Sequence, residues 1–388
     1  MSCQGALSGA LSVWAKASKN MKASEMTGLL HICLSQGWGG LEMYPLRVGS
    51  GMMARGWRVH GLALRGSKVA EGMKAQGFEV FELDSRGQGL RQLLTLRRWL
   101  KARDIRLVHC HKSGDLLLAA LLKRLWPLRL LFTEHMGATR PKRDPLHRWI
   151  YGKVDLVLSI SDETRRRNLK ALPLPASRIE RLWLGTDLTR CDEPAAEIRA
   201  ELGIAEDALL LGVLGRIGRG KGQPDLLEAF LLLAQAHPRL HLLIVGGTQA
   251  SEGSDEKVVA ALRQRINEAG VQERVLLTGF RRDTQRMLQA MDLVAIPSHN
   301  EAFGLTVIEA MAAGKAIVGA STGAVPEVLG EAGLLATPTD PAALAGQIAS
   351  LLVDESLRQR LGVAARERAQ REFSMSHHLD ELARRYQG

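Results

Sequence analysis

Short apolar runs alternate with segments of helical periodicity along most of the chain. Strands are expected at residues 29–34, 58–64, 78–83, 107–110, 130–133 and 156–160, and then at 209–214, 240–245, 275–277, 293–296, 316–318 and 334–336. Strands that are apolar throughout are buried on both faces, and helical segments between them are typical of parallel sheets wound by crossover helices. The two series therefore predict an α/β protein with two Rossmann-like domains.

The break between the two series indicates where one domain ends and the next begins. Gly185, Asp187 and Pro194 interrupt the periodicity there, and a length of 388 residues exceeds one usual core. We expect a first domain over residues 28–190 and a second over residues 191–373. Ligands of open α/β sheets bind beyond the carboxyl ends of the strands, which predicts a site in the cleft between the domains.

The spacing of the cysteines favours a cytoplasmic protein. Its four cysteines, Cys3, Cys33, Cys110 and Cys191, have no metal-ligand or C-x-x-C spacing, so no disulfide framework is expected. No apolar run is long enough to span a membrane. Residues 1–27 hold an apolar stretch that no basic segment precedes, so we expect a flexible leader rather than a signal peptide.

The positive charge is concentrated in the first half of the chain. Residues 1–190 contain 32 Lys and Arg against 15 Asp and Glu, whereas residues 191–388 contain 20 against 26. Leu94 and Trp99 interleave the cations of residues 97–106 on an amphipathic helix, which suits an anionic membrane surface, although a solvated basic helix face is the alternative. Nucleic acid is not expected, because few aromatic residues are available for stacking and no recognition motif is present.

Two carboxylates, Glu301 and Glu309, surround the start of a predicted helix. The apolar positions Leu305, Val307, Ile308 and Met311 predict a helix from near Ala302, with Glu309 about two turns inside it. At about 1.5 Å per residue the carboxylates lie about 10 Å apart, roughly the distance from a sugar to a ribose across a diphosphate. The free amides at Phe303, Gly304 and Leu305, together with the helix dipole, suit that diphosphate. This spacing also occurs on ordinary helices.

A glycine-rich loop at residues 215–222 follows the strand that ends at Leu214. Its backbone and its cations meet where phosphate binds in such folds. Arg216 suits bidentate bonds to phosphate and Lys221 supplies a point charge. Because Gly222 takes the place of the Ser or Thr of a P-loop, an ATPase of that class is not expected.

No metal ion and no separate cofactor are expected to take part in binding this diphosphate ligand. The chain lacks a D-x-D motif, so cations and helix amides must meet the charge of a diphosphate. His109 and His111 at one strand end supply half of a metal site at most. The alternative for His111 is a contact with a second substrate that would accept the sugar. Asp115 either orients that substrate or caps the helix that follows it.

The segment from Glu301 to Glu309 resembles the E-x7-E motif of retaining glycosyltransferases with the GT-B fold, in the group 1 (family 4) set. Further landmarks of that family follow in the expected order: Gly39-Gly40-Leu41-Glu42, His135, Gly185-Thr186-Asp187, Gly215-Arg216 with Lys221-Gly222, Val245-Gly246-Gly247, Gly279-Phe280 and the run 323–328. They extend over residues 28–388. The resemblance implies two Rossmann-like domains that face each other across a deep cleft, with a helix at 374–388 that returns to the first domain.

The resemblance also implies roles for single residues. Glu309 would hold the ribose, Glu301 the transferred sugar, and Arg216 with Lys221 the diphosphate. His135 would contact the sugar near the reacting centre. The loop of Gly39 and Gly40 would approach the diphosphate, whereas Gly247 and Phe280 would lie near the base.

The activity implied by the resemblance is a retaining transfer from a nucleotide-diphosphate sugar, without an enzyme nucleophile. UDP-sugars are favoured as donors, ahead of GDP-mannose and ADP-heptose. The expected acceptor is a hydroxyl of lipopolysaccharide core or of a lipid-linked polysaccharide precursor at the inner face of the cytoplasmic membrane. The basic first domain favours an anionic acceptor. The alternatives are an epimerase or hydrolase of the nucleotide-sugar and a binding protein without turnover.

Overall fold

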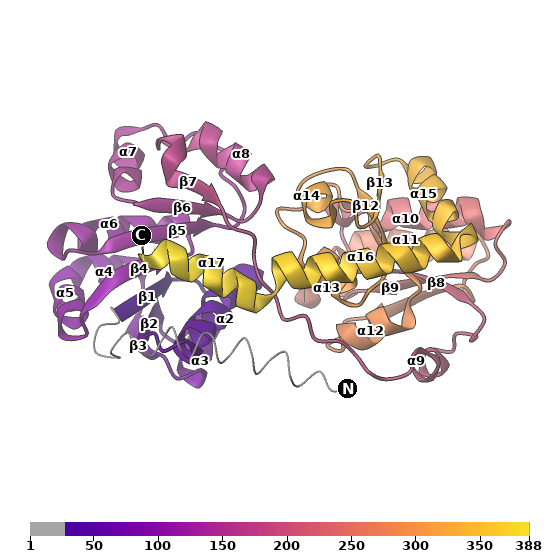
Figure 1. Ribbon diagram of the computed structural model, residues 1–388, viewed down its shortest axis with the longest axis horizontal. Helices are drawn as coiled ribbons and strands as arrows, with labels where there is room; N and C mark the ends of the chain where they lie inside the picture. Colours follow the sequence, from indigo (N-terminus) through magenta and orange to yellow (C-terminus); the bar gives the residue numbers. More distant parts are fainter. Residues whose placement is uncertain (1–27, 388) are drawn as a thin grey trace. The chain divides into compact units, whose positions relative to one another are not determined.

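The computed structural model describes residues 28–387, and the predicted leader at 1–27 lies outside this range (Figure 1). The described chain divides into two compact units. The first contains residues 28–159 and Arg167–Glu180, and the second contains Ile160–Arg166 and residues 181–387. The domain limits at residues 190 and 373, and the return of the last helix to the first domain, stay predictions.

The first unit is built on a seven-stranded sheet in the order β3-β2-β1-β4-β5-β6-β7. Its strands are β1 (Gly28–Cys33), β2 (Val59–Leu64), β3 (Glu79–Leu83), β4 (Ile105–Cys110), β5 (Arg129–Glu134), β6 (Leu156–Ser159) and β7 (Ile179–Arg181). Its helices are α2 (Gly40–Ala54), α3 (Lys68–Ala75), α4 (Arg86–Arg91), α5 (Leu93–Ala102), α6 (Leu116–Leu125), α7 (Pro145–Gly152) and α8 (Asp162–Ala171), the last of which also enters the second unit. Strands β1 to β6 pair in parallel.

The second unit holds a six-stranded parallel sheet in the order β10-β9-β8-β11-β12-β13. Its strands are β8 (Leu209–Leu214), β9 (Leu240–Val245), β10 (Val275–Gly279), β11 (Leu293–Ile296), β12 (Ala316–Ala320) and β13 (Leu334–Ala336). Its helices are α9 (Ala195–Glu201), α10 (Gln223–Ala234), α11 (Glu256–Glu268), α12 (Thr284–Ala290), α13 (Leu305–Ala312), α14 (Val325–Leu329), α15 (Pro341–Val353), α16 (Glu355–Phe373) and α17 (Met375–Gln387).

The predicted pair of Rossmann-like domains is confirmed by these two sheets. Every predicted strand is present, and β8, β9, β11 and β13 have the predicted bounds. Strand β7 was not predicted, because its three residues at the sheet edge include one apolar side chain, Ile179, and so carry no apolar run.

The amphipathic helix predicted at the cations of residues 97–106 corresponds to α5, but its apolar face belongs to the core of the first unit. Leu96 and Leu100 are buried there, and Leu93 and Trp99 pack against that core. Leu94 remains 63% exposed. The apolar face is therefore not available for insertion into a bilayer, and the solvated basic face is what α5 presents. Among the residues that the structure describes, no helix combines the length and the apolar character that crossing a membrane requires.

Helix α10 allows the core of the second unit to be tested against a surface position of the same helix. Phe230 is fully buried, whereas Leu232 is 61% exposed. We expect Phe230→Ala to lower the free energy of unfolding by about 3–5 kcal/mol, because the change removes buried apolar contacts and leaves a cavity. Leu232→Ala should change it by no more than about 0.5 kcal/mol. Urea denaturation of both variants measures this, and equal losses would contradict the assignment of the core.

Candidate functional site

The order of the strands in the second sheet reverses between β8 and β11. From β8 the order continues to β9 and β10 on one side, and from β11 to β12 and β13 on the other. Open α/β sheets bind ligands outside the carboxyl ends of the strands at such a reversal. The loop at 215–222 follows β8 and the loop at 297–304 follows β11. The structure thus brings the predicted Arg216, Lys221 and Glu301 to one edge of one sheet.

These two loops are in direct contact. The Lys221 ammonium donates a hydrogen bond to Glu301 Oε1, and the backbone amide of His299 donates to the Gly220 carbonyl at 3.0 Å. Gly222 has φ of +71°, and a Cβ there would lie 2.1 Å from the Pro297 carbonyl oxygen. Only glycine fits at this position. Without ligand, the predicted phosphate-binding cation and the predicted sugar-binding carboxylate therefore neutralise each other.

A third loop, after β12, fixes the backbone of Glu301. The Ala324 amide donates to the Glu301 carbonyl at 2.9 Å. A Cβ on Gly323 would lie 2.5 Å from the same oxygen, and the φ of Gly323 is +58°. The position of the Glu301 carboxylate thus depends on three neighbouring strand ends, β8, β11 and β12.

Helix α13 begins at Leu305 rather than near Ala302, which corrects the prediction. Gly304 precedes it with a left-handed φ of +91°, which ends the irregular loop. Glu309 is therefore little more than one turn inside the helix, not two. Gly304 provides no side-chain cap, so amides at the start of the helix keep their capacity to bind an anion. The side chain of Phe303 is buried and meets Phe373 edge to face at 6.0 Å between ring centroids.

The remaining predicted donor residues lie at strand ends of the same unit. Arg216 is exposed directly after β8. Phe280 follows β10 and is 57% exposed, so its ring is accessible for stacking. Gly247 has a structural reason to be glycine, because a Cβ there would lie 2.5 Å from the Glu252 side chain. The Glu252 carboxylate accepts a hydrogen bond from the Thr248 amide at 2.8 Å and holds that turn.

In the first unit the order of the strands reverses between β1 and β4, and the predicted Gly39 and Gly40 begin the helix after β1. A Cβ on Gly40 would meet no atom within 4 Å, so packing inside the protein does not explain this glycine. Next to it lies a network that sequence analysis did not assign. The Glu42 carboxylate accepts hydrogen bonds from Ser35 Oγ at 2.7 Å and from Lys112 Nζ at 3.2 Å. Burial raises the pKa of Glu42, but these bonds outweigh it and the net pKa is lowered.

Asp115 neither caps α6 through its side chain nor points to solvent, so the capping alternative is wrong. It is fully buried and accepts hydrogen bonds from the Leu34 amide and from Arg86 Nε, each at 2.8 Å. Burial raises the pKa of this carboxyl group, and both hydrogen bonds act in the opposite direction. Asp115 thus attaches the loop after β1 to α4 and acts as a structural anchor.

A cavity of about 600 Å³ lies next to this network in the first unit. Its lining includes His111 and the charged residues Arg86, Lys112, Glu134, Arg140 and Lys142. Burial raises the pKa of Glu134. The cavity therefore combines four cations with one carboxyl group whose ionisation is disfavoured, which is suitable for an anionic group.

His135 follows β5 and is 5% exposed. Its ring lies 5.0 Å from that of Tyr44 and 6.1 Å from that of His111, measured between centroids. The predicted sugar contact is thus part of a buried group of rings in the first unit. His31 on β1 belongs to the same group, and sequence analysis missed it because a single histidine in an apolar strand carries no motif.

Comparison with known proteins identifies the family. The profile described as "Glycosyltransferase Family 4" matches residues 38–190, and the one described as "Glycosyl transferases group 1" matches residues 194–368. The chain is 30% identical over 306 residues to the lipopolysaccharide core biosynthesis mannosyltransferase LpcC of Rhizobium leguminosarum bv. viciae. This match covers 76% of the chain and 82% of the relative.

Solved structures share the fold. A glycosyltransferase from Rickettsia africae ESF-5 superposes with a TM-score of 0.83 at 18% identity, over 93% of this chain and 98% of its own. HepE from Anabaena in complex with UDP gives 0.78 at 22% identity, over 92% and 99%. The predicted GT-B class of fold is thereby confirmed. The chain belongs to the group 1 (family 4) glycosyltransferases and is therefore an enzyme that transfers a sugar.

Proposed function

We propose that this enzyme transfers a sugar, with retention, from a nucleotide-diphosphate sugar to a hydroxyl group of an anionic glycan. The contact between Lys221 and Glu301 beside the start of α13 carries the proposal. One loop provides a cation, the next a carboxylate, and the helix start provides amides. This is the set of groups that a sugar joined to a diphosphate requires.

The Lys221–Glu301 ion pair gives donor binding an electrostatic logic. When the diphosphate arrives, the Lys221 ammonium exchanges a carboxylate for phosphate oxygens, and the Glu301 carboxylate becomes available to the sugar hydroxyls. Arg216 adds a second cation. Charge that develops on the leaving diphosphate then meets groups that are already in position, which lowers the barrier. No metal has a required part in this proposal.

Retention is proposed from the E-x7-E pattern of Glu301 and Glu309. The acceptor hydroxyl would attack from the face that the diphosphate leaves, and a diphosphate oxygen would take its proton. An epimerase or a hydrolase would instead convert the donor alone. Product analysis with and without acceptor separates these activities. The roles of His135, Gly39 and Gly40 in donor binding stay predictions.

UDP is the proposed nucleotide. HepE, which shares the fold, binds UDP, and the exposed ring of Phe280 offers a surface for a base. GDP-mannose is the second candidate, because the relative LpcC is a mannosyltransferase.

Nucleoside diphosphates should raise the melting temperature of the protein, with UDP above GDP and ADP. A ligand that binds only the native state at about 100 times its dissociation constant adds about 2.7 kcal/mol to stability. In Lys221→Met the affinity should fall about 10- to 100-fold, because a charge-assisted hydrogen bond is lost. Differential scanning fluorimetry over a range of nucleotide concentrations measures both effects.

Lys257→Met is the matched control, because Lys257 is an exposed lysine on α11 of the same unit. Its UDP affinity should equal that of the unchanged protein. A larger shift with GDP than with UDP would contradict the choice of nucleotide. The absence of a shift with all three would contradict the donor class.

The acceptor is proposed to be a phosphorylated glycan such as lipopolysaccharide core. The cationic cavity of the first unit supports this proposal. Hydrogen bonds to Asp115 and Ser35 hold Arg86 and Lys112 in place at the cavity. Arg140 is exposed there and so is accessible to a phosphate group. The similarity to LpcC, a lipopolysaccharide core enzyme, supports it as well. A lipid-linked polysaccharide precursor is the second candidate.

Arg140→Gln should lower kcat/KM for a phosphorylated core oligosaccharide about 10- to 100-fold, because one charge-assisted contact is lost. Radiolabelled sugar transfer at several acceptor concentrations measures this. Arg148→Gln on α7 is the control and should have no such effect, since Arg148 is exposed and does not line the cavity. An equal loss of kcat/KM in Arg140→Gln with a dephosphorylated acceptor would show that the cavity does not recognise phosphate.

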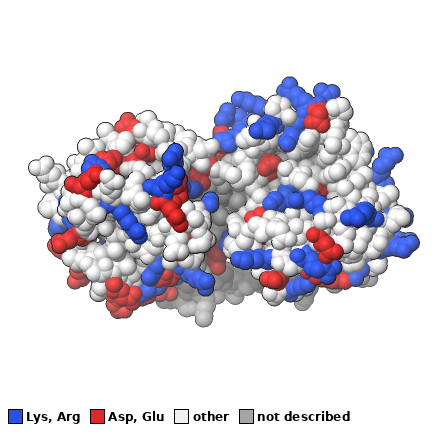
Figure 2. All heavy atoms as spheres, turned by 180° about the vertical axis from the view of Figure 1, so that it is seen from behind, with Lys and Arg blue, Asp and Glu red and all other residues white. Residues whose placement is uncertain are grey.

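Peripheral attachment to the inner face of the cytoplasmic membrane is also proposed. Lys and Arg side chains gather over the first unit on the face drawn in Figure 2. Because the apolar face of α5 is buried, such attachment would be electrostatic rather than insertive.

Binding to vesicles with anionic lipids should weaken at least about tenfold between low salt and physiological ionic strength, where the Debye length is about 8 Å. Cosedimentation measures it. The double change Arg98→Gln with Lys101→Gln on α5 should weaken binding. Lys257→Gln with Arg263→Gln on α11 should not, although it removes the same charge. Vesicle binding that does not depend on salt would count against an electrostatic surface on the first unit. An equal loss of binding in the two double variants would count against it as well.

A further inference from the structure

The register of two neighbouring strands brings three histidines together. His31 of β1 lies opposite His109 of β4 in a parallel pair. His111 lies two residues after His109, and alternate residues of a strand point to the same face. All three side chains are buried, with at most 1% exposed. The pair at 109 and 111, which sequence analysis treated as half of a metal site at most, thus gains a third imidazole from a distant part of the chain.

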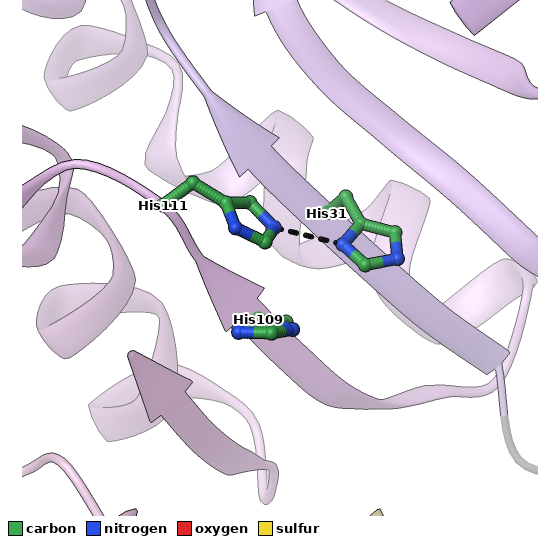
Figure 3. Close-up of side chains that lie close together, drawn as sticks. All are labelled: His31, His109 and His111. Carbon is green, nitrogen blue, oxygen red and sulfur yellow. Dashed lines mark hydrogen bonds between the residues drawn. The ribbon is translucent and has the colours of Figure 1, made fainter. Parts of the chain in front are cut away.

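The three rings lie close together, and His31 and His111 face each other (Figure 3). His31 Nδ1 and His111 Nε2 lie 2.9 Å apart, and one ring nitrogen from each of the three residues lies within 4.8 Å of the others. Zinc binds imidazole nitrogen at about 2.0–2.1 Å, which separates tetrahedral ligand atoms by about 3.4 Å. Small rotations of the rings therefore suffice to place the three nitrogens around one ion.

The surroundings of the cluster suit a metal ion. The three imidazoles are buried together, and His31 Nδ1 and His111 Nε2 face each other at 2.9 Å. Neutral imidazole is the form that binds metals. His109 Nε2 lies 2.7 Å from Thr133 Oγ1, and outer-shell partners of this kind orient metal-bound histidines.

We propose that His31, His109 and His111 form a binding site for a divalent transition metal ion, with Zn²⁺ as the expected occupant. Sites with three histidines keep a fourth position for water or another ligand. His111 also lines the 600 Å³ cavity of the first unit, which provides both a route of entry and space for that ligand. The same cavity is the one proposed above for the acceptor, whereas the donor groups Lys221 and Glu301 belong to the other unit. Metal binding is measured directly below, so its outcome does not depend on whether the proposed transfer occurs.

The test uses full-length protein that has been treated with a chelator and then titrated with Co²⁺, a spectroscopic substitute for Zn²⁺. We expect visible absorption typical of four-coordinate Co²⁺ with nitrogen ligands, saturation at one ion per chain, and loss of the signal when Zn²⁺ is added. The melting temperature should rise with bound Zn²⁺. Saturation far below one ion per chain, or absorption typical of hexa-aqua Co²⁺ alone, would overturn the proposal with no need for a variant.

Variants identify the ligands. His31→Gln and His109→Gln should each lower Zn²⁺ affinity at least about tenfold, as loss of a ligand does. His60→Gln is the matched control, because His60 is also buried and lies on β2 beside β1 without belonging to the cluster. It should bind Zn²⁺ as the unchanged protein does. Circular dichroism verifies folding of each variant, and equal Zn²⁺ affinity in all three would overturn the assignment.

Discussion

The close approach of the loops after β8 and β11 is the constraint on which the candidate site depends. A side chain at position 222 would collide with the Pro297 carbonyl, and the backbone there has a left-handed φ, so the residue must be glycine. This approach brings the Lys221 ammonium to the Glu301 carboxylate. Since both loops extend from neighbouring parallel strands, the contact is held by the sheet itself rather than by flexible side chains. A cation and an anion are thus kept in place before any ligand binds.

Both units apply the same topological principle to different chemistry. Where the strand order reverses in the second unit, the loops present a cation, a carboxylate and helix amides. At the corresponding place in the first unit, Asp115 holds the loop after β1 and Glu42 holds Lys112 beside a cationic cavity. Parallel sheets concentrate function in this way because all their strands end at one edge, and ligands of open sheets bind where the strand order reverses.

Sequence patterns predicted the sheets well, and their failures have physical causes. The strands were visible because a strand covered on both faces must be apolar throughout. The start of α13 was misplaced because the apolar pattern does not reveal that Gly304 adopts a left-handed conformation. For α5 the pattern left a membrane surface and a solvated basic face as alternatives, because periodicity shows that a face is apolar but not what covers it. In the folded chain that face is covered by the core of the first unit.

The amino-acid sequence by itself determined the class of fold, the order of the family landmarks and the presence of Glu301, Lys221 and Gly222 at the ends of predicted strands. The tertiary structure alone decided that Lys221 and Glu301 form an ion pair, and that His31 joins His109 and His111. The reason is that local propensity and periodicity are properties of neighbouring residues. The register between strands that are far apart in the chain is set by packing of the whole sheet.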